Sequence, residues 1–190
     1  MLKLRQLQQK KQEELKKKEM PASKRSPTQM LSPARMRLER DIKALDLPPT
    51  VTVDIINRPA DINEKPLLYI YISPDDGFYE GGHFKFGFSI NENYPIDAPK
   101  VSCLNRLYHP NIDIDGKICL NILREDWRPV LDLQSIIIGL LFLFLEPNAQ
   151  DPLNKEAALT LNNDRVQFKQ MVKMSMSGER INNIRYDNVL

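Results

Sequence analysis

The sequence is poor in the residues that build disulfide frameworks, metal sites and cysteine proteases. Its 190 residues include only two cysteines and two histidines. Two cysteines cannot form a disulfide scaffold, and these four residues lack the paired spacing of a zinc site. A cysteine protease needs a histidine that takes the thiol proton, whereas His109 precedes a proline and is better suited to brace a turn. We therefore expect no metal, no cofactor and no protease activity.

Long hydrophobic runs are also missing. The longest, from Ile136 to Leu145, is too short to span a bilayer and is typical of a buried helix. The basic N-terminus is not followed by the apolar segment of a signal peptide. We therefore expect no membrane partner, and a reducing compartment, which is the cytosol, the nucleus or both.

Positive charge is concentrated at the N-terminus. Residues 1–32 contain nine Lys/Arg and three Glu, while the whole chain has a net charge of +2, so the remainder is acidic. A basic segment without interleaved aromatic residues does not indicate nucleic-acid binding. Its sparse leucines cannot bury a helix face on their own. We expect a flexible N-terminal docking tail and linker over residues 1–31, and one folded domain over residues 32–190.

Hydrophobic periodicity predicts an α+β fold. Ser32 and Pro33 are residue types that begin a helix, and Pro48-Pro49 is expected to end it. Alternating apolar residues then predict four strands, over residues 52–57, 67–73, 83–90 and 100–104. After an irregular stretch, helices are expected over residues 132–145, 153–161 and 164–176. The order is an N-terminal helix, a four-stranded antiparallel sheet and C-terminal helices.

Cys119, in the irregular stretch, is the candidate for covalent chemistry. A lone cysteine is by itself more often a small core residue, and this applies even more to Cys103 within a predicted strand. Thioester exchange requires an exposed thiol that acts as nucleophile and leaving group, and a donor for the oxyanion. Asn111 is a candidate donor, or a residue that stabilises the turn. Asp151 either orients or deprotonates an attacking lysine, or caps the next helix.

Several short motifs occur in a fixed order around Cys119. They are Tyr94-Pro95, His109-Pro110-Asn111, Cys119 after seven further residues, Trp127-Arg128-Pro129 and Asp151-Pro152. In this combination the chain resembles the ubiquitin-conjugating enzyme family, over about Ser32 to Met176. The resemblance implies the ubiquitin-conjugating-enzyme fold, and a catalytic domain that carries a ubiquitin-like modifier as a cysteine thioester.

The resemblance also implies a role for each matching residue. Cys119 carries the thioester, Asn111 supports the oxyanion or holds the active-site loop, and Asp151 lines the path of the incoming lysine. Three residues are structural and lie near the site: His109, Pro110 and Trp127. Three lie on loops that face a RING-type ligase: Ile96, Pro129 and Val130. The first helix would meet the activating enzyme.

Within the family, the chain is similar to the neddylation branch, and its tail is fungal-like. Two segments carry this likeness, Cys119 to Trp127 and the N-terminal Met1 to Leu7 with the Lys/Gln run that follows. It implies a cullin-directed ubiquitin-like modifier, a heterodimeric activating enzyme and a cullin substrate. The tail would dock on the activating enzyme through Leu2, Leu4 and Leu7, and acetylated Met1 would enter a pocket of a Dcn-type co-ligase. Ubiquitin as cargo, or a non-catalytic scaffold of the same fold, are the alternatives.

Overall fold

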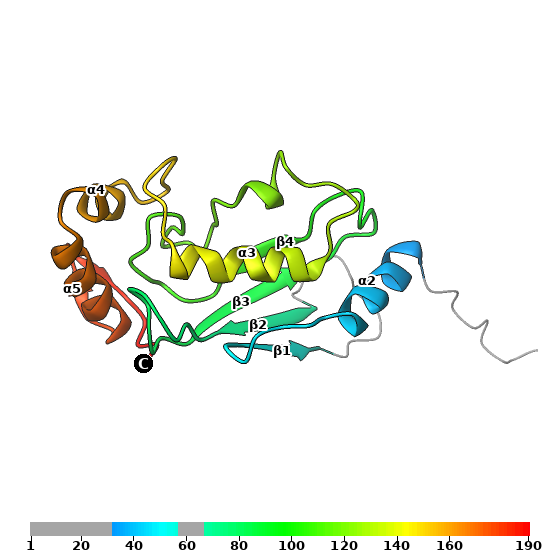
Figure 1. The fold of residues 1–190 in the computed structure, drawn as a ribbon, viewed down its shortest axis with the longest axis horizontal. Helices are drawn as coiled ribbons and strands as arrows, with labels where there is room; N and C mark the ends of the chain where they lie inside the picture. The colour runs from blue at the N-terminus through cyan, green and yellow to red at the C-terminus, as the bar shows by residue number, and fades with distance from the viewer. Residues whose placement is uncertain (1–31, 57–66) are drawn as a thin grey trace, which may run out of the picture. The chain divides into compact units, whose positions relative to one another are not determined.

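A four-stranded antiparallel sheet is the centre of the described part of the chain (Figure 1). The computed structural model describes residues 32–56 and 67–190, so the predictions for Met1, Leu2, Leu4 and Leu7 lie outside the described residues. The strands follow one another in chain order: β1 (Val51–Ile55), β2 (Leu68–Ile72), β3 (Phe84–Ser89) and β4 (Lys100–Cys103). Each pairs with the next in antiparallel register.

The helix α3 (Leu133–Leu145) packs across one face of this sheet. Phe84, Phe86 and Phe88 alternate along β3 and are fully buried, as the period of two predicts. Phe144 of α3 stacks on Phe84 with ring centroids 4.3 Å apart. The run expected as a buried helix is exposed at one position, because Phe142 lies on the side of α3 that faces away from this core and is 56% exposed.

The first helix, α2 (Pro33–Lys43), begins as the sequence predicts but ends earlier. The Ser32 hydroxyl accepts a hydrogen bond from the backbone N–H of Arg35. The prediction that the helix continues to Pro48-Pro49 is wrong. The N–H of Ala44 closes the last turn, and the N–H of Asp46 donates instead to Oε1 of Gln134 in α3, at 2.8 Å.

The C-terminal part consists of α4 (Lys155–Asn163), α5 (Arg165–Met176) and a hairpin of two short strands, β5 (Arg180–Ile181) and β6 (Ile184–Arg185). The α+β prediction is confirmed, although the hairpin was not expected. Between β4 and α3, the predicted irregular stretch contains only the short 3-10 helix η1 (Asn121–Leu123) and isolated bridges. Among the described helices, none is long and apolar enough to cross a membrane.

Candidate active site

The loop that carries Cys119 is fixed by its backbone. The chain leaves Asn111, turns at Asp113 to Gly116 and returns antiparallel, with Ile112 bridged to Ile118. The N–H of Cys119 donates to the carbonyl of Asn111 at 2.8 Å. At the turn, one carboxylate oxygen of Asp113 accepts from the N–H groups of Asp115 and Lys117, at 2.9 and 2.8 Å. Asn111 and Cys119 therefore lie opposite each other.

Gly116 anchors this loop to strand β4. Its carbonyl accepts from the N–H of Cys103 at 2.9 Å, and its φ of 82° lies in the left-handed region that favours glycine. A Cβ at this position would come within 2.1 Å of the Cys103 carbonyl oxygen. Only glycine fits here, so the turn before Cys119 is held against the sheet.

The two thiols have different environments. Cys103 is only 5% exposed and belongs to the core, and its Sγ donates to the carbonyl of Asn105 at 3.3 Å. Burial raises the pKa of Cys103 to about 12, so this thiol stays protonated at neutral pH. Cys119 is partly exposed. Of the two, Cys119 alone is in a position to meet a large partner.

A cleft of about 280 Å³ opens beside Cys119. Its walls bring together the candidate catalytic residues and side chains from the loops around them: Asn111, Cys119, Leu120, Asn121, Ile122, Leu143, Asn148, Gln150 and Asp151. The three residues predicted as catalytic from the sequence thus line one cavity.

Asn111 is held by the backbone of a distant residue. Its side chain is buried, Nδ2 donates to the carbonyl of Asn148 at 2.8 Å, and Oδ1 accepts from the N–H of Asn148 at 3.0 Å. This two-bond contact joins the Cys119 loop to the segment after α3. Of the two predicted roles for Asn111, the contact favours holding the loop over direct support of the oxyanion.

His109 is fully buried behind the site. Burial lowers its pKa to about 4, so the ring is neutral at physiological pH. The ring nitrogen Nδ1 accepts from the N–H of Asn111 and Nε2 donates to the carbonyl of Leu143, each at 2.9 Å. The carbonyl of Pro110 accepts from Leu153 at 2.9 Å. Both ring nitrogens are occupied, and His109 braces the turn.

The other histidine, His83, is exposed and bonds to Ser73 Oγ at 2.7 Å. Its backbone N–H donates to the carbonyl of Val189, near the C-terminus. Because the chain has only these two histidines, the site provides no imidazole base for Cys119, and a protease mechanism has no support. Among the described residues, no cluster of three or more His, Cys, Asp or Glu could hold a metal ion.

Asp151 is exposed at the edge of the cleft, with a positive φ of 47°. The alternative that it caps the next helix is wrong. Asn154 is the N-cap of α4, and its side chain accepts from the N–H of Ala157 at 3.1 Å. The Asp151 carboxylate therefore has no part in capping, which leaves the role toward an incoming lysine as the remaining prediction for this residue.

The predicted ligase-facing residues are exposed on two loops. Ile96 is 74% exposed, Val130 is 85% exposed, and Pro129 beside it is exposed as well. Trp127 is buried beneath them, and its Nε1 donates to the carbonyl of Pro95 at 2.9 Å. Trp127 thereby joins the two loops.

Asn148, the partner of Asn111, was not identified from the sequence. A local signal exists, because Asn148 follows Pro147, which stops α3, and asparagine is common in turns. The pairing itself could not be foreseen, since the two residues lie 37 positions apart.

The fold places a partly exposed thiol at a cleft, an arrangement that a carrier of acyl groups requires. The sequence model of the ubiquitin-conjugating enzyme family matches residues 37–176. The chain belongs to the ubiquitin-conjugating enzyme family, and it is an enzyme that works through a cysteine thioester, with a ubiquitin-like modifier and an activating enzyme.

The relatives that match this chain carry more specific names than the family does. The NEDD8-conjugating enzyme UBC12 of Saccharomyces cerevisiae is 53% identical over 192 residues, which cover 100% of this chain and 99% of the relative. The Nedd8-conjugating enzyme UbcE2M of Drosophila melanogaster is 52% identical over 77% of this chain and 79% of the relative. The solved structure of S. cerevisiae Ubc12 matches with a TM-score of 0.80 and 52% identity, over 98% of each chain.

Proposed function

We propose that this chain is the conjugating enzyme of neddylation, which takes a NEDD8-type modifier onto Cys119 and transfers it to a lysine of a cullin. The observation that carries the proposal is the position of Cys119. Its thiol is partly exposed at a cleft that also contains Asn111 and Asp151. Relatives at about half identity and nearly full length bear the name of NEDD8-conjugating enzymes.

The first step is an exchange of thioesters. The thiolate of Cys119 attacks the carbonyl carbon at the C-terminus of the modifier, which is bound as a thioester to the activating enzyme. The bond to the activating enzyme's sulfur breaks, and that sulfur leaves as a thiolate. One thioester replaces another, so no further ATP is consumed at this site.

The second step forms the isopeptide bond. The uncharged amine of a substrate lysine attacks the same carbonyl carbon, the C–S bond breaks, and Cys119 leaves as a thiolate. The proton lost by the amine passes to water or to the Asp151 carboxylate, which also orients the amine. Asn111 contributes by keeping the Cys119 loop in register with the segment after α3.

The remaining partners are assigned by the resemblance. Ile96, Pro129 and Val130 face the RING-type ligase that holds the cullin, and α2 meets the heterodimeric activating enzyme. Leu2, Leu4 and Leu7 of the tail dock on that enzyme, and acetylated Met1 binds a Dcn-type co-ligase. Residues 32–190 are the catalytic domain. The two reduced thiols suit the cytosol, the nucleus or both.

The test is to incubate the full chain with the heterodimeric activating enzyme, NEDD8 and ATP. We expect an adduct on Cys119 that a reducing agent removes. Cys119→Ser should give an adduct that resists reduction, because an oxygen ester replaces the thioester, and Cys103→Ser should charge as the wild type does. An adduct on Cys103 would overturn the assignment of the site, and no adduct at all would leave a non-catalytic scaffold.

The identity of the cargo is tested in the same assay. Ubiquitin with its own activating enzyme should charge Cys119 far more slowly than NEDD8 with its enzyme. Faster charging with ubiquitin would show that the chain is an ordinary ubiquitin carrier of the same fold.

A further inference from the structure

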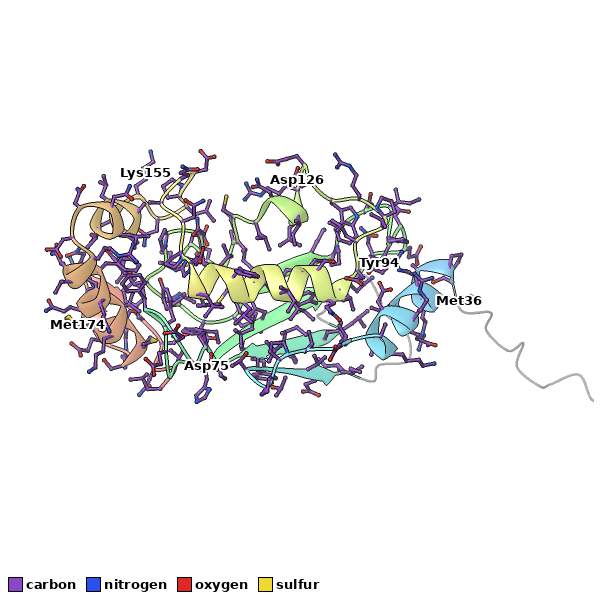
Figure 2. All side chains as sticks on the ribbon, viewed as in Figure 1. Met36, Asp75, Tyr94, Asp126, Lys155 and Met174 are labelled. Carbon is purple, nitrogen blue, oxygen red and sulfur yellow. The ribbon has the colours of Figure 1, made fainter. Side chains whose placement is uncertain are left out.

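Two exposed apolar side chains, Ile96 and Val130, are presented by separate loops that share one buried anchor. The anchor consists of four side chains, called here the Arg37 cluster: Arg37, Asp41, Tyr94 and Trp127. Figure 2 shows Tyr94 beside α2 and near the N-terminal end of α3. The cluster therefore lies where α2, α3 and both loops meet.

Arg37 bonds directly to the loop that carries Val130. Its Nη1 donates to the carbonyl of Pro129 and its Nη2 donates to the carbonyl of Leu131, each at 2.8 Å. These are the residues immediately before and after Val130. The guanidinium thus fixes the backbone on both sides of Val130, while the Val130 side chain stays 85% exposed.

Asp41 and Tyr94 extend the anchor to the loop that carries Ile96. Nε of Arg37 donates to the Asp41 carboxylate at 2.8 Å, and that carboxylate also accepts from the hydroxyl of Tyr94. Burial, and then the bond to Asp41, raise the pKa of Tyr94, so its hydroxyl stays a donor. The loop is fixed a second time where Trp127 donates to the carbonyl of Pro95, at 2.9 Å.

The cluster depends on an arginine. The side chain of Arg37 is 15% exposed and that of Asp41 is 4% exposed, so each buried charge is paired. A guanidinium has several N–H donors in a fixed plane and here reaches three partners at once. A lysine ammonium keeps the charge opposite Asp41 but cannot hold two carbonyls on separate residues with the same geometry.

We propose that Arg37 is a positioning residue for ligase engagement, which holds the loops of Ile96 and Val130 in the form that the ligase binds. Ordering a loop on binding costs free energy, and a loop ordered in advance avoids that cost. The inference rests on the proposed function, in which these loops face the RING-type ligase. Arg37 is not among the residues that line the cleft beside Cys119, so in this role it acts through the loops.

The test uses full-length chain charged with NEDD8 in advance, so that the charging step does not enter. Discharge to free lysine is measured without ligase and with rising concentrations of a cullin-bound RING subunit. For Arg37→Lys we expect the half-saturating RING concentration to rise about three- to tenfold. The maximal rate and the ligase-free rate should not change, and a merely destabilised protein would not show this split.

A matched control is Arg165→Lys on α5. Each arginine lies over an aromatic ring, Arg37 with its Cζ 5.8 Å from the Tyr94 centroid and Arg165 with its Cζ 4.9 Å from the Phe78 centroid. Helix α5 lies at the opposite end of the domain from α2 in Figure 1. Arg165→Lys should titrate like the wild type. Val130→Ala removes the presented side chain and should weaken the response to the RING subunit with the Arg37 cluster intact.

The outcomes separate this inference from the function on which it rests. If Val130→Ala weakens the response but Arg37→Lys does not, the positioning role is wrong and the ligase face stands. If neither Val130→Ala nor Ile96→Ala changes the response, the ligase face itself is wrong, and the positioning role with it. An equal loss of ligase-free discharge in Arg37→Lys, or the same shift in Arg165→Lys, would also overturn the inference. Failure to form the thioester at all would show before the titration and would refute the proposed function.

Discussion

The backbone carbonyl of Asn111 accepts a hydrogen bond from the N–H of Cys119, while the side chain of Asn111 is bonded at both ends to the backbone of Asn148. One residue therefore fixes the nucleophile's loop on one side and the segment after α3 on the other. The position of the thiol therefore depends on these contacts between loops.

Gly116→Ala should destabilise the protein much more than Gly81→Ala. Both glycines have a positive φ, 82° and 81°, so alanine costs about 1–2 kcal/mol at either position. A Cβ at Gly81 meets nothing within 4 Å, whereas at Gly116 it comes within 2.1 Å of the Cys103 carbonyl. We expect a total loss of about 3–5 kcal/mol for Gly116→Ala in urea unfolding. Equal losses would show that the turn moves away from β4 without cost.

Asn111→Ala should lower the free energy of unfolding by about 2 kcal/mol, because two hydrogen bonds to Asn148 are lost. Discharge to lysine should slow in parallel. Asn148→Ala is the control, since it keeps the backbone groups that Asn111 uses and should change stability by less than about 1 kcal/mol. Slower discharge with unchanged stability would instead support a direct role of Asn111 at the oxyanion.

The two thiols should react with iodoacetamide at very different rates. In the folded protein at pH 8 we expect one alkylated residue, Cys119, because Cys103 is buried and its pKa is raised to about 12. Both should react in guanidinium chloride. Peptide mass spectrometry identifies the modified residue, and rapid labelling of Cys103 in the native protein would contradict the buried position.

Stability should fall as the pH drops from about 6.5 toward 4, in part because of His109. Its pKa is lowered from 6.5 to about 4 in the folded protein. Between these two values the unfolded state binds a proton that the folded state does not, so the free energy of unfolding decreases as the pH falls. The effect amounts to at most about 3 kcal/mol at the acid end. His109→Gln should flatten the slope of unfolding free energy against pH, and an unchanged slope would contradict this role of His109.

Deletion of residues 1–18 should slow the charging of Cys119 while leaving thermal unfolding unchanged. The tail would raise the local concentration of the chain at the activating enzyme, as a tether does. The rate of thioester formation at limiting activating enzyme is the measurement. Unchanged charging kinetics would remove this role of the tail.

The strands and α3 could be predicted because their signals are local. The alternation of Phe84, Phe86 and Phe88 predicts a strand with one buried face. Asp132 caps α3, because its carboxylate accepts from the N–H of Ser135. The motifs around Cys119 predict the site from the sequence alone. The alternation and the helix cap depend on neighbours within a few residues.

The remaining features depend on distant partners. Asp46, just after α2, donates its N–H to Gln134, and Arg37 bonds to carbonyls 92 and 94 positions further along the chain. Hydrophobic periodicity does not predict which distant carbonyls an arginine side chain will bind. The hairpin of β5 and β6 is local, but its strands of two residues are too short to give an alternation that predicts them.

Val189, close to the C-terminus, packs into the core and is held there by backbone hydrogen bonds. Val189 is buried, its carbonyl accepts from His83, and its N–H donates to the carbonyl of Met176. The family match stops at Met176, before these contacts of Val189 are reached. A polypeptide cut after Met176 would lose three buried side chains, Ile181, Tyr186 and Val189, together with the strand β5 that packs against α5.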